Sequence, residues 1–148
     1  MEAFQTLMLK WRRSDQSFTP NELGLIKSQG KLIKIARDSK DNPTRVAAVR
    51  LLTDQKVLAE VALNEKDYRT RFAAVEQLAD QSVLAEVAIN DKESKIRYAA
   101  VKRITDQRAL AEVVVNGQYD VLSKPVCGWA AGRIKDQDIL IEMVKSEK

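Results

Sequence analysis

The sequence predicts an all-α fold, a right-handed α-solenoid of about four to five stacked helix pairs with atypical capping ends. Three observations predict it. A segment of 26 residues recurs along the chain, and each copy holds two short stretches whose apolar residues have helical spacing. Neither stretch is long enough to form a stable helix alone. Each pair also has an apolar face that it cannot bury by itself, and stacking against a neighbouring pair would bury it.

The repeat is visible in two blocks of sequence. The block 54–62 reads Asp-Gln-Lys-Val-Leu-Ala-Glu-Val-Ala, and it returns with few changes at 80–88 and 106–114. The block 45–49 reads Arg-Val-Ala-Ala-Val, and it returns at 71–75 and 97–101. The step is 26 residues in both blocks, which predicts repeats at 28–53, 54–79, 80–105 and 106–135.

The first helix of each repeat is predicted from its apolar stripe and its starting residue. Val57, Leu58, Val61 and Ala62 have the spacing that places them on one side of a helix. An aspartate precedes this stripe, where its side chain can accept hydrogen bonds from free backbone N–H groups. The sequence therefore predicts a structural capping role for Asp54, Asp80, Asp106 and Asp136.

The second helix of each repeat is expected to start near Arg69 in the second copy. The first copy supports this boundary, because Asn42 and Pro43 are suited to the N-cap and the first helical position. Ser94 is expected to cap the same helix in the third copy. Paired alanines, at 47–48, 73–74 and 99–100, predict close approach between neighbouring helices.

The ends and the fourth copy depart from the pattern. Residues 1–27 keep only traces of the repeat and are expected to form an N-terminal cap, while 136–148 are expected to form a C-terminal capping helix of a single domain over 1–148. The fourth step is 30 residues long, with the additional residues around 117–125. In that copy Cys127 takes the position of the repeated arginine, and Gly128 and Trp129 follow it.

The block Arg-x-Ala-Ala-Val-x-x-Leu resembles the second helix of HEAT repeats. The short unit is also similar to the HEAT-like repeats of bilin-lyase-type proteins and to the leucine-rich repeat variant. The resemblance covers residues 28–148 and implies a HEAT- or armadillo-like solenoid that serves as a scaffold or binding surface. It also implies that the repeated arginine is structural and joins adjacent units by hydrogen bonds. The matching positions are Arg45, Arg71 and Arg97.

Composition narrows the classes of function. The chain has no histidine, which removes the commonest general base and metal ligand, and its single cysteine excludes an internal disulfide. We expect no cofactor, no metal site and no enzymatic activity. No apolar run is long enough to cross a bilayer, and the first residues lack a signal-peptide layout, so we expect a cytoplasmic protein without a membrane partner.

Candidate binding residues are those that vary at fixed positions of the second helices, which line the concave side in HEAT-like arrays. Aromatic residues and arginine dominate binding energy at protein interfaces, which favours Phe72, Tyr98 and Arg103. The alternative is that Phe72 and Tyr98 pack between neighbouring repeats. The full candidate set is Arg50, Phe72, Glu76, Tyr98, Lys102, Arg103 and Arg133.

Three function classes remain open. The favoured one is a scaffold or adaptor that binds another protein in a concave groove, with self-association as a variant. The second is nucleic-acid binding, which the basic residues among the candidates favour and Glu76 disfavours. An enzyme or a lyase accessory is the third, and it rests on analogy of fold alone.

Overall fold

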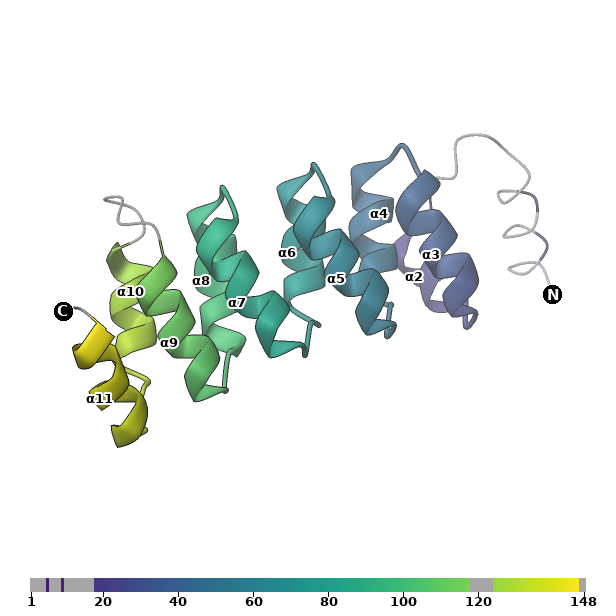
Figure 1. Cartoon of the computed structure of the whole chain (residues 1–148). Helices are drawn as coiled ribbons and strands as arrows, with labels where there is room; N and C mark the ends of the chain where they lie inside the picture. The colour runs from purple at the N-terminus through teal and green to yellow at the C-terminus, as the bar shows by residue number, and fades with distance from the viewer. Residues whose placement is uncertain (1–4, 6–8, 10–17, 118–123, 147–148) are drawn as a thin grey trace. The chain divides into compact units, whose positions relative to one another are not determined.

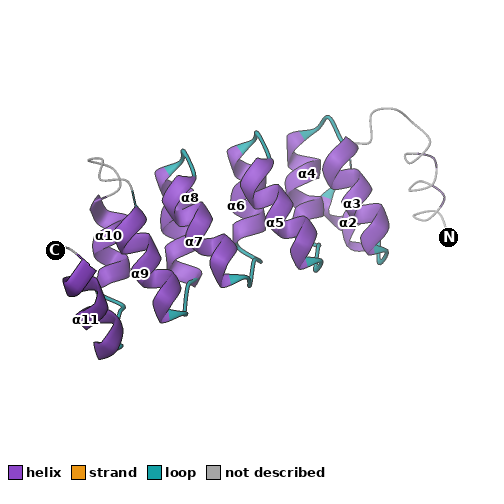
Figure 2. Cartoon of the chain, in the orientation of Figure 1, coloured by secondary structure: helices purple, strands orange, loops and turns teal. Residues whose placement is uncertain are grey.

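A computed structural model of the chain describes residues 5, 9, 18–117 and 124–146. Within these residues the protein has ten helices and no strand. Figure 1 labels the helices along the chain, and Figure 2 colours them by secondary structure. The all-α prediction is confirmed for this part of the chain. The chain divides into two compact units, Met1–Gln77 (unit 1) and Leu78–Lys148 (unit 2), and the single domain over 1–148 stays a prediction.

Unit 1 contains a short helix followed by two helix pairs. Helix α2 pairs with α4, α3 with α4, α5 with α6, and the second helices α4 and α6 lie against each other. Most of the predicted N-terminal cap, 1–27, lies outside the described residues, but its last part forms α2 with a Thr19 cap. The bounds are α2 Pro20–Gly24, α3 Gln29–Asp38, α4 Asn42–Val49, α5 Gln55–Asn64 and α6 Tyr68–Val75.

Unit 2 repeats the arrangement and ends on a lone helix. Helix α7 pairs with α8 and α9 with α10, while α7 contacts α9 and α8 contacts α10. The last helix, α11, packs on α9. The extra residues of the fourth copy, 118–123, lie outside the described residues. The bounds are α7 Gln81–Asn90, α8 Ser94–Arg103, α9 Gln107–Asn116, α10 Lys124–Ala131 and α11 Gln137–Ser146.

The buried core residues of each unit stand at the same positions in successive copies of the repeat. The first helices start at Gln29, Gln55, Gln81 and Gln107, 26 residues apart, and each places a leucine three residues on in a fully or almost fully buried position. Ala48, Ala74 and Ala100 are completely buried on the second helices, which lets neighbouring helices approach closely. The buried leucines are Leu32, Leu58, Leu84 and Leu110.

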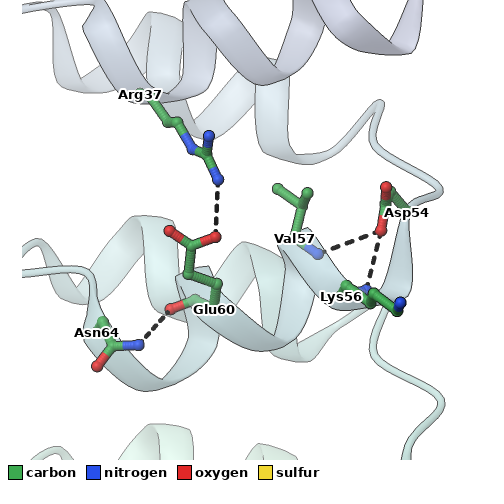
Figure 3. A network of polar contacts seen from close by, with 6 residues as sticks. All are labelled: Arg37, Asp54, Lys56, Val57, Glu60 and Asn64. Atoms are coloured by element: carbon green, nitrogen blue, oxygen red, sulfur yellow. Dashed lines mark hydrogen bonds and ion pairs between the residues drawn. The ribbon is translucent and has the colours of Figure 1, made fainter.

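Aspartates cap most of the helices. The side chain of Asp54 accepts from the N–H groups of Lys56 and Val57, and Asp80 and Asp136 accept from the two equivalent groups of their helices. Asp106 accepts from one of them, the N–H of Ala109. Figure 3 shows the Asp54 cap beside an Arg37–Glu60 ion pair, 2.7 Å long, that joins α3 to α5.

Two starting residues of the second helices differ by one position from the prediction. In the first copy the cap is Asp41, whose carboxylate accepts from the N–H of Thr44, so Asn42 is already helical. In the third copy the N-cap residue is Glu93, without a side-chain cap bond, and Ser94 is the first residue of α8. An aspartate three residues before a threonine can bond both its N–H and its hydroxyl, which explains the choice of Asp41.

A glutamine at the first position of each first helix joins that helix to the loop before the next one. Its amide oxygen accepts from backbone N–H groups there, as Gln81 does from Thr105 at 2.7 Å and from Asp106 at 3.1 Å. Gln29 accepts from Thr53, and Gln107 accepts from Lys135 and Asp136. In Gln55 the amide nitrogen donates to the carbonyl of Gln77. The loops between repeats therefore have their backbone groups satisfied by a repeated side chain.

Candidate interaction surface

The repeated arginines hold the turn inside their own helix pair. Arg71 is almost completely buried and donates from Nη1 to the carbonyls of Glu65 and Lys66, both at 3.0 Å. Arg97 donates to the carbonyl of Asp91 at 2.7 Å, and Arg45 to that of Ser39 at 2.9 Å. These carbonyls end the first helix of the same pair, whereas the HEAT resemblance implied bonds to the adjacent pair.

A second set of bonds to backbone carbonyls comes from another position of the repeat, two residues after the end of the Ala-Ala-Val block. Gln77 donates to the carbonyl of Val49 at 2.7 Å in unit 1. In unit 2 Arg103 donates to the carbonyl of Leu78 and Arg133 to that of Val101, at 2.6 Å for Arg133. Arg103 and Arg133 therefore have a structural bond in addition to any role in binding.

In unit 1 the candidate residues form a weak polar contact. Arg50 and Glu76 lie at equivalent positions after α4 and α6, and their side chains approach to 3.8 Å while 61% and 47% exposed. An ion pair in water at this distance contributes little to stability. Phe72 is half-buried on α6. The surface of this unit brings together charges of opposite sign.

In unit 2 the candidate residues meet an additional aromatic side chain. The rings of Tyr98 on α8 and Trp129 on α10 lie 5.3 Å apart between centroids, tilted by 58°. The guanidinium of Arg133 lies over the Trp129 ring, 5.1 Å from its centroid. Tyr98 is 42% exposed and Trp129 37%. We call Tyr98, Trp129 and Arg133 the aromatic cluster.

Trp129 was absent from the residues predicted to bind a partner. The available signal was the irregularity of the fourth copy, where Cys127, Gly128 and Trp129 replace the regular Arg-x-Ala. Trp129 stands at the position of Ala99, and only packing of α10 beside α8 brings a side chain at that position onto Tyr98. Tyr98 and Trp129 stand at different positions of the repeat, so aligning the copies does not predict a contact between them.

Cys127 is buried at the position of the repeated arginine. Its Sγ lies 3.7 Å from the carbonyl oxygen of Val113, and a methyl group added at Gly117 would come within 2.7 Å of the same sulfur. The thiol and Gly117 thus fit together where the other copies have an arginine and its loop carbonyls. Packing accounts for this cysteine without a reactive role.

One carboxyl group of the first-helix caps has a perturbed pKa. The hydroxyl of Ser82 donates to Asp80 at 2.7 Å and lowers the pKa of that carboxyl, and the N–H of Val83 adds to the effect. Asp80 is exposed and serves as a cap. Its shifted pKa therefore has a structural cause.

The described residues contain no group of three or more His, Cys, Asp or Glu side chains placed to hold a metal ion. In the same part of the chain, no helix has both the length and the apolar character that crossing a membrane requires. No family model, curated protein or solved structure matches this chain.

Proposed function

We propose that the protein is a non-enzymatic scaffold or adaptor that binds another protein in a concave groove, on the face lined by its second helices. Its helix pairs would stack as a right-handed, HEAT-like α-solenoid, so that this face continues from repeat to repeat. The observation that carries the proposal is the aromatic cluster, two exposed aromatic rings and an arginine held together on successive second helices.

The composition of the cluster favours protein binding. Trp, Tyr and Arg are the residue types most enriched among the side chains that dominate interface energies. Covering the exposed part of either ring would contribute about 2 kcal/mol from apolar area. Because the rings touch each other and Arg133, their rotamers are restricted before a partner arrives, which lowers the entropic cost of binding.

Charge supports a protein partner over nucleic acid. Unit 2, which contains the aromatic cluster, has 11 Lys/Arg and 11 Asp/Glu, so it carries no net charge that would attract a polyanion. In unit 1, Arg50 lies beside Glu76. Nucleic-acid binding through the basic candidates therefore stays the alternative, and it predicts a steep loss of affinity with salt.

The test is a pull-down of tagged full-length protein from a lysate of its source organism, with and without nuclease. The test variant is Tyr98→Ser with Trp129→Ala, which removes both rings and keeps the backbone bond of Arg133. We expect a protein to be captured despite nuclease and to be lost with this variant. Capture that disappears with nuclease would support the nucleic-acid alternative in place of the proposal.

A matched control separates binding from folding. Tyr68→Ser removes another exposed aromatic side chain, on α6 in unit 1, and is expected to leave capture unchanged. Circular dichroism of the three proteins should show equal helix content. If the cluster variant and wild type capture the same proteins, the second-helix face of unit 2 is not the binding surface.

A further inference from the structure

We propose that the aromatic cluster and the lysines beside it bind an acidic protein segment, one that places an apolar side chain against Tyr98 and Trp129 and carboxylates against Lys95, Lys102 and Arg133. This inference rests on the proposed function and specifies the chemistry of the partner.

Helix α8 presents a basic stripe through Tyr98. Lys95, Tyr98 and Lys102 are spaced by three and four residues, so they lie along one side of the helix, and all three are exposed. The ten residues of α8 include four cations and no carboxylate. An apolar ring between two lysines is suited to a segment in which carboxylates flank an apolar side chain.

Helix α10 continues this surface without adding an acidic group. It contains no Asp or Glu, and Arg133 follows it over the Trp129 ring. Gly128 and Gly132 stand where Tyr98 and Lys102 stand one repeat earlier. A methyl group at Gly128 would meet no atom within 4 Å, so the backbone beside Trp129 is open to an approaching chain.

The first helices of the same unit together carry more acidic than basic side chains. Helix α7 has one carboxylate and no cation, α9 has one of each, and α11 has two carboxylates against one lysine. Their exposed acids are Glu86, Glu112, Asp138 and Glu142. Unit 2 is therefore neutral as a whole but polarised, because its second helices α8 and α10 carry five cations and no carboxylate, and the exposed rings also lie on these two helices.

This pattern favours an acidic protein segment over single-stranded nucleic acid. A base would need a free aromatic face, but one side of Trp129 is covered by the Arg133 guanidinium and Tyr98 packs against it at a tilt. The remaining ring edges can contact an aliphatic or aromatic side chain. Three or four local cations match a short acidic segment, whereas a neutral unit has no long-range attraction for a polymer of phosphates.

The experiment is a selection from a random peptide display library on immobilised full-length protein. It is repeated on Tyr98→Ser and on Lys102→Glu, a charge reversal that keeps both rings. We expect wild type to enrich peptides that combine Asp or Glu with at least one large apolar residue. We expect the enriched peptides to bind Lys102→Glu about tenfold more weakly in fluorescence anisotropy, and to lose most of their affinity for Tyr98→Ser.

The matched control is Arg108→Glu, the same charge reversal at an exposed position of the first helix α9. It should leave the affinity of the selected peptides within about twofold of wild type, since the screened field of a charge on another face is weak. An equal loss from Arg108→Glu and Lys102→Glu would mean that net charge alone drives binding, and it would overturn the proposal.

The remaining outcomes separate this inference from the proposed function. Enrichment of neutral or basic peptides that still require Tyr98 would overturn the acidic chemistry and leave the surface as a protein-binding site. Enriched peptides that bind wild type and Tyr98→Ser equally would overturn both. Absence of any enrichment overturns the acidic-segment proposal, while the lysate pull-down continues to test the scaffold function on folded partners.

Discussion

The aspartates before α5, α7 and α9 all cap the helix that follows them, but their neighbours differ. Position 82 holds serine where the second and fourth copies hold Lys56 and Arg108, and the Ser82 hydroxyl gives Asp80 an additional hydrogen bond. A depressed carboxyl pKa in the folded state means that Asp80 stabilises the fold above its unfolded pKa. This contribution is lost as the pH falls through the lower, folded pKa.

We therefore expect Ser82→Ala to raise the pKa of Asp80 toward its ordinary value, with the Val83 N–H bond keeping part of the depression. The measurement is an NMR titration of the Asp80 carboxyl carbon. Ser94→Ala, which removes a hydroxyl at the start of α8, serves as the control and should leave that titration unchanged. An unchanged Asp80 pKa in Ser82→Ala would show that the hydroxyl is not its cause.

The space around Gly117, and not its backbone conformation, requires a glycine at this position. Its φ of −63° is open to any residue, but a methyl group there would lie 2.5 Å from the Val113 oxygen and 2.7 Å from the Cys127 sulfur. We expect Gly117→Ala to lower the free energy of unfolding by about 1–3 kcal/mol, because backbone and sulfur must both move.

Gly128→Ala is the matched comparison for Gly117→Ala, since its methyl group meets open space. Inside helix α10 it should stabilise by up to about 1 kcal/mol through helix propensity. Urea denaturation of both variants measures the difference. Equal stability of the two variants would contradict the close approach of Gly117 and Cys127.

At the scale of the helix, repeated polar side chains connect the helices to the loops and turns by hydrogen bonds. The first helices of the four pairs are joined through their leading glutamines to the loop before the next first helix. The second helices of the first three pairs are joined to their own turns through an arginine, whereas in the last pair Cys127 contacts the Val113 carbonyl inside α9. The glutamine was visible in the sequence as part of the Asp-Gln repeat. Its partners were not, because they lie 22–29 residues away and depend on how helix pairs stack.

We expect Gln81→Ala to cost about 1–2 kcal/mol of unfolding free energy, because it leaves the N–H groups of Thr105 and Asp106 without this acceptor. Hydrogen exchange of these two amides should accelerate at the same time. Gln137→Ala, at the same position of the exposed start of α11, should change stability by less than about 0.5 kcal/mol. Similar costs for the two variants would contradict the role of the glutamine bonds.

At the scale of the whole molecule, the repeat predicts that the same substitution at equivalent buried positions of the two units lowers the unfolding free energy by a similar amount. Leu58 in α5 and Leu84 in α7 are both completely buried, 26 residues apart. We expect Leu58→Ala and Leu84→Ala each to lower the unfolding free energy by about 2–5 kcal/mol through lost burial and the cavity left behind. Denaturant titration of the two variants measures this.

Leu63→Ala is the control for both leucines, since Leu63 is 38% exposed on α5 and should cost less than half as much. A cost below about 1 kcal/mol for either buried leucine would mean that the two units do not share one packing scheme.

The sequence by itself determined the all-α class, the 26-residue helix pairs, the aspartate caps of the first helices and the buried leucines and alanines. These follow from local spacing, because apolar periodicity and capping chemistry act within a few residues. Only the tertiary structure decided which side chains meet across repeats. The Tyr98–Trp129 contact, the partners of Arg103, Arg133 and the glutamines, and the fit of Gly117 to Cys127 depend on how one helix packs beside another. Side-chain reach across a packed interface is set by the relative position of two helices, and no spacing within one helix encodes it.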